Sequence, residues 1–521
     1  MPDDVPQRPA FASGSTLLLL GLIALAGFWI RWRTIGAESP WLDEILTTAY
    51  AHLPVSTFLF DQPYNHPPLH LLLHKLFVHP ADDAVSIRSL SLAFGVLSFP
   101  AICLFGRIIA GERAGVIAAA LLAAWPVHIF YSQEARSYTL LLFLILLSAT
   151  ALADALGRPP EDRRRSYLVF AFFAGLTFWV HYIGVFWIAL GIAVIALDVL
   201  AEGKRARHLR PPLRTPLRTL GPAAILLGVL FAAALPQFFG GLYHALFTWL
   251  AVPDLATLIE TIHTVYGVLG LGKLNAPLSL MLVGMASLGL ALLALRRWQQ
   301  AALVAGLCLI PVALFIVSQV KPVLLVRTAQ IGVPGVVLAI AVLLARLPSA
   351  YAYLSTAAIA AVLVMSTERQ RDHRPLFSKD LEEEVALFYA ELRPGDTVLF
   401  NQNMTYNSVH YFLPDNREAS FFLRCDNGKP VRRAPPDTAW QEVYLGSCHN
   451  YFLANPFADQ AAPIAEQAFL EAAEDAERVW LVDWRNPADP ARRESFEYAT
   501  GRPLHLWRDM GLFDVYRSDA P

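Results

Sequence analysis

Long apolar runs recur through the first 366 residues and constrain the fold of this chain more than any other feature. Each run has 17 or more residues, so as a helix it could cross the ~30 Å hydrocarbon layer of a bilayer. Charged residues make up 16% of the chain, against about 25% in ordinary soluble domains. The sequence therefore predicts a polytopic α-helical membrane protein with about 11 transmembrane helices, at residues 15–33, 87–106, 114–131, 138–156, 167–183, 185–201, 219–237, 277–295, 300–318, 323–345 and 349–366.

Positive charge alternates between the connections of these predicted helices and indicates their orientation. Lysine and arginine concentrate in the short cytoplasmic loops of membrane proteins. The basic connections contain Arg107 and Arg113; Arg158 and 163–165; 204–218; Arg296 and Arg297; and Arg346. This pattern predicts a cytoplasmic N-terminus and an extracytoplasmic C-terminus, although Arg31 and Arg33 fall at the outer end of the first helix.

The apolar runs end near residue 366 and a polar tail follows, which predicts two domains: a membrane domain at 1–366 and a soluble extracytoplasmic α/β domain at 367–521. The membrane domain has a first outer loop, 34–86, with a juxtamembrane helix at 69–77, and a long outer loop, 238–276. Apolar residues at helical spacing in the second loop predict an interfacial helix able to border a lipid substrate. In the tail, alternating patterns predict strands at 395–402, 478–485 and 512–518 and helices at 381–392 and 465–477.

An acid pair, Asp43 and Glu44, lies in the first outer loop. Carboxylates this close to a membrane are expensive to desolvate and usually have a function. A carboxylate could act as a general base for a sugar-acceptor hydroxyl that attacks an anomeric carbon. One base suffices if the transfer inverts the sugar, because no covalent intermediate is needed. The alternative is a helix cap for the residues that follow, and the two roles are compatible.

Three histidines, His66, His70 and His74, follow at four-residue spacing, with a Pro-Pro pair after the first. The prolines stiffen the start of a helix, and a helix that included His66 would carry the three histidines in one stripe. They could contact a phosphate, or simply suit a membrane interface. Metal ligation together with the acid pair is a lesser alternative, because no second ligand set with metal spacing follows. A divalent metal is therefore the alternative that these histidines leave open, and no other cofactor is predicted.

Other candidate side chains come from later outer connections. Arg136, near Tyr138, could bind a lipid phosphate with its guanidinium fork, or it could form an ion pair with Glu134 that closes a turn. His181 lies at the outer turn between two predicted helices, where a structural role is the alternative.

The last candidates are Lys321 and Arg327, of which Arg327 lies about four residues inside an apolar run. A cation at that depth needs a partner or a phosphate, so we predict contact with an anionic lipid head group. The alternative is that its side chain extends to the membrane surface.

The cysteines and the charge pattern limit other interpretations. Cys103 and Cys308 lie in apolar runs, whereas Cys425 and Cys448 lie in the tail and could pair if the tail is extracytoplasmic. No basic run with interleaved aromatic residues is present, so nucleic acid is not indicated as a partner.

The order of motifs resembles that of the GT-C glycosyltransferases of the protein-mannosyltransferase and aminoarabinose-transferase type. These motifs are WLDE at 41–44, HPPLH at 66–70, SQEARSYTLLLF at 132–143, His181-Tyr182 and Arg327 near Pro334. The resemblance covers roughly residues 15–345 and implies an inverting transfer from a polyprenyl-phosphate sugar at the extracytoplasmic face. It also implies that Asp43 is the base, with Glu44 as its neighbour. The chain departs from the family at Thr328, where bacterial members commonly have tyrosine.

Together these observations predict a glycosyltransferase of the bacterial inner membrane. Its donor would be a single sugar on a polyprenyl phosphate, and its acceptor a glycan, lipid A, another lipid or a protein. Asp43 would deprotonate the acceptor, while Arg136, Arg327 and Lys321 would stabilise the departing phosphate, with His66, Tyr138 and His181 near the donor. The alternative is a transporter or flippase for a lipid-linked sugar, although such proteins often have internal repeats, and none is present here.

Overall fold

The computed structural model of the protein describes residues 13–51, 55–56, 67–78, 83–205, 214–244, 251–371, 381–400, 408–409, 412, 420–423, 462–463, 473–484, 497, 500–510 and 513–518. The chain forms two compact units. The first unit comprises Met1–Thr34, Asn65–Leu73 and Arg88–His373, and the second comprises Ile35–Tyr64, His74–Ile87 and Arg374–Pro521.

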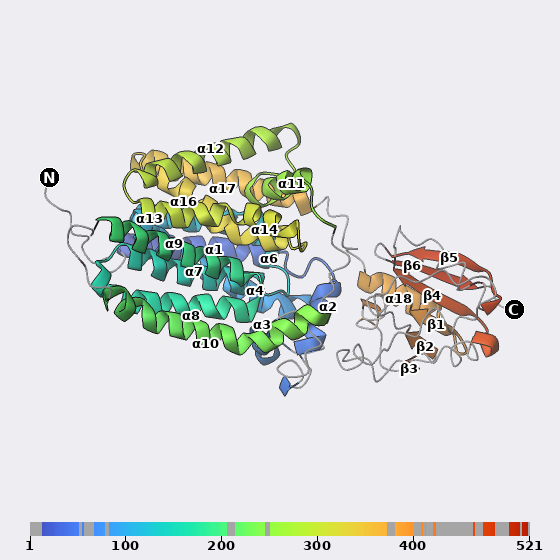
Figure 1. The fold of residues 1–521 in the computed structure, drawn as a ribbon. Helices are drawn as coiled ribbons and strands as arrows, with labels where there is room; N and C mark the ends of the chain where they lie inside the picture. Colours follow the sequence, from blue (N-terminus) through green and yellow to red (C-terminus); the bar gives the residue numbers. More distant parts are fainter. Residues whose placement is uncertain are drawn as a thin grey trace. The chain divides into compact units, whose positions relative to one another are not determined.

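Apolar helices that lie side by side make up most of the first unit (Figure 1). This arrangement confirms the predicted polytopic helical fold. The helices are α1 (Gly14–Trp32), α4 (Ala84–Ala110), α5 (Glu112–Ala124), α6 (Pro126–Tyr131), α7 (Tyr138–Leu156), α8 (Arg164–Val180), α9 (Gly184–Arg205), α10 (Arg214–His244), α11 (Leu255–Tyr266), α12 (Asn275–Ala294), α13 (Trp298–Cys308), α14 (Ile310–Ser318), α15 (Val326–Ala329), α16 (Val333–Leu344) and α17 (Ser349–Arg371).

Among the described residues, 8 helices are long and apolar enough to cross a membrane, or up to 9 if α13 and α14 form one span bent by 50°. The predicted count of 11 is not confirmed. The predicted span 114–131 is divided at Trp125 into α5 and α6, and the predicted span 167–183 corresponds to α8, which has 17 residues. Pro126 accounts for the division, because proline lacks the N–H that a continuous helix needs and favours an extended residue before it.

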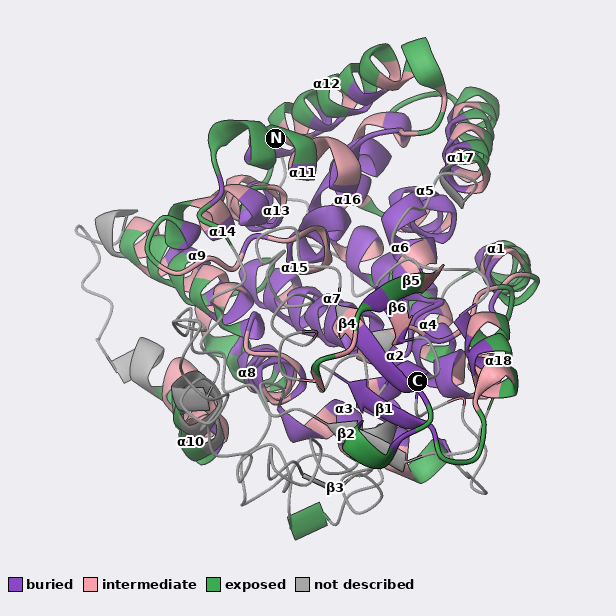
Figure 2. Ribbon diagram, turned by 90° about the vertical axis from the view of Figure 1, so that its right-hand side faces the viewer, coloured by how far each residue is buried: buried purple, intermediate pink, exposed green. Residues whose placement is uncertain are grey.

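Helices α7 and α16 form the centre of this bundle, and both are buried along most of their length (Figure 2). Outer helices such as α1 instead expose large apolar side chains, including Leu18 and Leu25. Glycines allow close helix packing: a Cβ on Gly115 would collide with the carbonyl oxygen of Cys103, and one on Gly289 with that of Ala339. An apolar exterior and small residues at helix contacts are what a membrane-embedded bundle requires.

At the break between α13 and α14, a backbone carbonyl group is hydrogen-bonded within the protein. Pro311 cannot donate to the carbonyl of Leu307, so the helix cannot continue with regular bonds at this point. The hydroxyl of Tyr266, at the end of α11, donates to the carbonyl oxygen of Cys308 over 3.0 Å. A Cβ on Gly332 would collide with the Tyr266 hydroxyl oxygen, so glycine is needed there.

Two helices predicted in the outer loops are present. The helix predicted at 69–77 is α3 (Pro68–Phe77), and the one predicted in the 238–276 loop is α11. Asp254 caps α11, because its carboxylate accepts the N–H of Thr257 over 2.8 Å. Leu258 and Val265 are buried, whereas Leu255 and Ile259 are exposed, so α11 has apolar residues on both faces. The start of the predicted loop belongs to α10, which continues to His244.

The second unit contains a 6-stranded sheet in the order β3-β2-β1-β4-β6-β5. Strands β3, β2, β1 and β4 are parallel to one another, and β6 runs antiparallel to both of its neighbours, β4 and β5. Helix α18 buries Val385 and Phe388 against Trp480 and Val482 of the sheet. The strand bounds are β1 (Thr397–Phe400), β2 (Ser420–Leu423), β3 (Ala462–Pro463), β4 (Val479–Trp484), β5 (Leu504–Asp509) and β6 (Phe513–Ser518), and α18 is Leu381–Glu391.

These elements confirm the α/β prediction for the tail in part. The three predicted strands are β1, β4 and β6, and the predicted helix 381–392 is α18. Of the second predicted helix, 465–477, residues 473–477 are described; 473–475 are helical, and the two that follow are not. Strands β2, β3 and β5 were not predicted. Cys425 and Cys448 lie outside the described residues, while Cys103 and Cys308 are free thiols.

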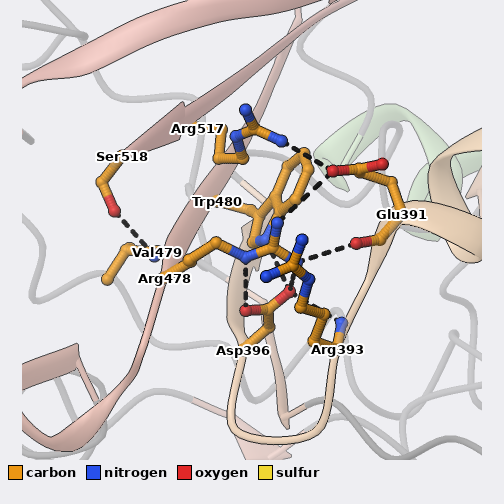
Figure 3. A network of polar contacts seen from close by, with 8 residues as sticks. All are labelled: Glu391, Arg393, Asp396, Arg478, Val479, Trp480, Arg517 and Ser518. Atoms are coloured by element: carbon orange, nitrogen blue, oxygen red, sulfur yellow. Dashed lines mark hydrogen bonds and ion pairs between the residues drawn. The ribbon is translucent and has the colours of Figure 1, made fainter. Parts of the chain in front are cut away.

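A buried carboxylate, Asp396, organises the region before β1 and β4 (Figure 3). It accepts two hydrogen bonds from Arg478, at 3.0 and 2.6 Å, one from the indole N–H of Trp480 at 3.0 Å and one from the backbone of Arg393 at 2.9 Å. Arg478 also donates to the backbone oxygen of Glu391 over 2.8 Å. The guanidinium also lies 3.4 Å from the carboxylate of Glu391, but Asp396 is the buried carboxylate that accepts two of its hydrogen bonds.

Replacing Asp396 with alanine is expected to destabilise the sheet by about 3–5 kcal/mol, because Arg478 would remain buried with only the partly exposed Glu391 carboxylate, 3.4 Å away, as a counter-charge. Hydrogen exchange of peptides containing β1 and β4 in the full chain would measure this. Glu391→Gln is the matched control: its side chain is 38% exposed, so about 1 kcal/mol or less is expected. Equal protection in the two variants would show that Asp396 does not have this role.

Candidate active site

The acid pair lies in the first turn of α2 (Leu42–Ala51), within the second unit. Glu44 is fully buried, and its carboxylate accepts the backbone N–H of Trp41 over 3.3 Å. The third helical residue thus satisfies the N–H of the capping residue, as in a capping box. Asp43 is partly exposed, and its backbone carbonyl accepts the hydroxyl of Thr47 over 2.7 Å. The structure therefore gives Glu44 the capping role, which leaves Asp43 as the more accessible carboxylate.

The histidine series is described in part. His66 lies outside the described residues, whereas His70 and His74 lie on α3 and are buried. Among the residues that the structure describes, no group of three or more histidine, cysteine or acidic side chains could hold a metal ion.

Arg136 lies in the non-helical connection between α6 and α7. Its backbone is held at both ends: its N–H donates to the carbonyl of Glu134 over 2.7 Å, and its carbonyl accepts the hydroxyl of Ser91 over 2.9 Å. Arg136 and Glu134 are both buried. The guanidinium is thus carried on a short, fixed segment instead of on a free loop.

His181 ends α8 and lies at the turn that leads to α9. Its Nδ1 accepts the backbone N–H of Ile183 over 3.1 Å, so the neutral ring carries its proton on Nε2. The ring of Tyr138, at the start of α7, lies 5.6 Å from that of His181 between centroids. Tyr138 and His181, predicted from separate motifs, are therefore neighbours.

Arg327 lies in α15, after a stretch of extended backbone. Two hydroxyl groups fix that stretch. Ser318 Oγ accepts the N–H groups of Val323 and Leu324, each over 2.9 Å, and Thr328 Oγ1 donates to the carbonyl of Val323 over 2.9 Å. Thr328, at the position where the sequence departs from the pattern that it otherwise resembles, thus has a local structural role.

Arg136 and Arg327 both act electrostatically on His181. Burial, followed by the positive charges of Arg136 and Arg327, lowers the pKa of His181 from its ordinary 6.5 to about 3. The first unit therefore brings together Arg136 and Tyr138, His181, and Arg327 from three separate places in the chain. Two guanidinium groups beside a neutral imidazole donor form an environment suited to a phosphate. Lys321 lies at the end of α14, with its backbone N–H bonded to Val317, and is partly exposed.

Acid is expected to destabilise the first unit through His181. Between pH of about 6.5 and 3 the unfolded chain binds a proton at His181 that the folded chain does not, so the free energy of unfolding falls as the pH falls through this range. Thermal unfolding in detergent at several pH values would measure this, with His181→Gln as the variant that cannot titrate. The prediction fails if the variant loses as much stability in acid as the original protein.

Sequence reasoning missed the side chains that hold these groups in place, among them Ser91, Ser318 and Thr328. Small hydroxyl residues within apolar runs are common, so their presence alone gives no signal. Arg31 was noticed only as a charge on the unexpected side of the membrane.

The fold and the arginine–histidine cluster point to a class of membrane enzyme. Residues 65–227, less than half of the chain, match the family model described as dolichyl-phosphate-mannose-protein mannosyltransferase. This range includes Arg136, Tyr138 and His181. The chain is an integral membrane protein with the fold of the GT-C glycosyltransferases, which confirms the resemblance seen in the sequence.

The particular structures that it resembles include ArnT from Cupriavidus metallidurans. The form bound to undecaprenyl phosphate matches with a TM-score of 0.61 and 13% identity over 97% of this chain and 98% of ArnT. The apo form matches with a TM-score of 0.58 at the same identity and coverage. The oligosaccharyltransferase AglB from Archaeoglobus fulgidus, in complex with an inhibitory peptide and a dolichol-phosphate, matches with a TM-score of 0.50 and 11% identity over 96% of this chain and 74% of AglB. No curated protein matches the chain.

Proposed function

We propose that the protein is an inverting glycosyltransferase that moves one sugar from a polyprenyl-phosphate carrier to an acceptor at the extracytoplasmic face of the membrane. The observation that carries this proposal is that Arg136 and Arg327 both lie close enough to His181 for their positive charges to lower its pKa. Two cations in a poorly hydrated place would stabilise the phosphate charge that develops as the sugar leaves. The fold shared with ArnT, which was solved with undecaprenyl phosphate, supports a lipid phosphate as the ligand.

In this reaction the acceptor oxygen attacks the anomeric carbon as the bond from that carbon to the phosphate oxygen breaks. Asp43 takes the proton of the acceptor hydroxyl, and Glu44 maintains the helix turn that presents Asp43. Arg136 and Arg327 bind the departing phosphate, with Tyr138 and the Nε2–H of His181 beside it. His66 and Lys321 are further donor contacts. The acceptor is a glycan, lipid A, another lipid or a protein.

The proposed setting is a bacterial inner membrane with a cytoplasmic N-terminus. Residues 1–366 would form the membrane-embedded catalytic domain, and residues 367–521 would lie in the periplasm or outside the cell. The alternation of basic connections supports this orientation.

The second candidate is a transporter of lipid-linked sugars, which the bent pair α13 and α14 makes worth testing. Transporters use broken helices to expose backbone carbonyls to a substrate or ion. Here the carbonyl at the break, that of Cys308, accepts a hydrogen bond from Tyr266. This contact favours the transferase.

The deciding experiment supplies purified full-chain protein with a synthetic polyprenyl-phosphate sugar and a mixture of acceptors, and follows release of polyprenyl phosphate. The transferase should release it in an acceptor-dependent way. In parallel, the protein in liposomes is tested for movement of the intact donor between leaflets. Movement without any release would overturn the proposal in favour of the transporter.

A further inference from the structure

Arg31, near the end of α1, has a fully buried side chain. Its guanidinium donates to the carbonyl oxygens of Gly27 and Ala123, each over 2.9 Å, and lies 2.8 Å from Nδ1 of His128. Its central carbon lies 5.0 Å from the centre of the Phe99 ring. Among the described residues none provides a carboxylate for Arg31, so the side chain is held by neutral groups.

These contacts bind α1 to the division between α5 and α6. Ala123 belongs to the last turn of α5, where carbonyl groups lack partners within the helix and attract a cation. Arginine has no acceptor, so His128 must accept at Nδ1 and carry its own proton on Nε2. The planar guanidinium group of arginine can contact two carbonyls and an imidazole at once, and the compact ammonium group of lysine cannot.

The same residue is connected to the segment that carries Arg136. The side-chain amide of Gln133 donates to the backbone oxygen of Arg31 over 2.6 Å and to the hydroxyl of Thr34 over 2.8 Å. Ser132 donates to the carbonyl oxygen of His128 over 2.6 Å. The Arg31 side chain thus contacts His128 at the start of this segment, and it anchors the end of α1, whose backbone oxygen at Arg31 accepts from Gln133.

On the other side, α4 limits movement of the same segment. A Cβ on Gly95 would collide with the side chain of Ser132, so the two backbones approach closely. Ser91, one turn earlier on α4, donates to the carbonyl of Arg136 over 2.9 Å. Residues 132–136 are therefore held between α1 and α4 without being helical themselves.

We propose that Arg31 is a positioning residue that acts through Gln133 and His128 to hold Arg136 where it binds the phosphate of the lipid carrier. This inference rests on the proposed function, because it takes Arg136 as a phosphate ligand. It assigns Arg31 no contact with the substrate. Loss of Arg31 should therefore weaken phosphate binding by releasing Arg136.

The test measures the Kd of a short-chain polyprenyl phosphate for the purified full chain. Arg136→Ala should weaken binding by roughly 10- to 100-fold, as expected for loss of a charge-assisted hydrogen bond. Arg31→Met should weaken it by about 5- to 20-fold, since the guanidinium of Arg136 remains but is no longer fixed. Gln133→Leu removes the hydrogen bond to the backbone oxygen of Arg31 without removing a charge, so it breaks the second connection and keeps the inference testable if Arg31→Met does not fold.

Arg33→Met is the matched control. Arg33 lies two residues from Arg31, but its side chain is 37% exposed and pairs with Glu368 on α17. Its removal changes the net charge by the same amount and should alter the Kd less than about 2-fold. An equal effect of Arg33→Met and Arg31→Met would show that only the charge matters.

The decisive measurement repeats Arg31→Met in the Arg136→Ala background. If Arg31 acts through Arg136, the second substitution should change the Kd by less than about 2-fold, whereas independent effects would multiply. A full additional loss would overturn the inference and leave the proposed function intact. Absence of polyprenyl phosphate binding by the original protein would instead overturn the proposed function.

Discussion

Asp43→Asn is expected to reduce the rate of sugar transfer by about 10²- to 10⁴-fold, the usual contribution of a positioned general base. The acceptor hydroxyl would have to attack the anomeric carbon while keeping its proton, and asparagine cannot take that proton. Binding of polyprenyl phosphate should be nearly unchanged, because the base acts on the acceptor. The measurements are single-turnover transfer from a polyprenyl-phosphate sugar and the Kd of the phosphate alone.

Glu44→Gln is the matched control for this prediction. Glutamine can accept the same hydrogen bond from the backbone of Trp41, so α2 should begin at the same residue. If Glu44 only caps the helix, Glu44→Gln should keep most of the transfer rate. A folded Asp43→Asn variant with full transfer would show that Asp43 is not the base. If Glu44→Gln were inactive at the same time, the base would be Glu44.

The sequence predicted the helical fold because apolar runs of this length have few alternatives in water or in a membrane. It could not predict the number of spans. The run at 114–131 is continuously apolar, and only the conformation around Trp125 and Pro126 divides it into two helices. In the tail, strands β4 and β6 are rich in β-branched and aromatic residues, whereas β5 (LHLWRD) is a half-exposed edge strand with little pattern.

Arginines illustrate what charge counting can and cannot do. Arg31 and Arg33, the exceptions to the predicted orientation, have structural roles, one among helix carbonyls and one in an ion pair with Glu368. Arg113 and Arg297, counted as cytoplasmic charges, also donate to carbonyls at helix ends. Helix capping therefore contributes to the charge pattern from which the orientation is predicted.

The candidate site was predictable only as a set of isolated residues. Arg136, His181 and Arg327 stood out because polar groups at the ends of apolar runs are expensive to bury. Their meeting depends on non-helical backbone in two connections, and that backbone is fixed by Ser91 and Ser318. Such hydroxyl contacts join residues 5 to 45 positions apart, and no sequence period marks them.

Arg327→Met is expected to have two effects that no general loss of stability would produce together. The Kd for polyprenyl phosphate should rise by roughly 10- to 100-fold, because a charge-assisted contact to the phosphate is lost. At the same time the pKa of His181 should rise, because one of the two cations that lower it is removed.

The second effect changes stability in acid in a defined direction. A higher pKa for folded His181 narrows the pH range in which the unfolded chain alone binds the proton, so Arg327→Met should lose less stability between pH of about 6.5 and 3 than the original protein. Arg113→Met is the control, since Arg113 donates to Ala345 and Leu347 at the other end of α16. It should change neither the Kd nor the loss of stability between pH of about 6.5 and 3. If Arg327→Met weakened binding but lost as much stability in acid as the original protein, Arg327 would not lie near His181. The phosphate site would then have to be sought around Arg136 alone.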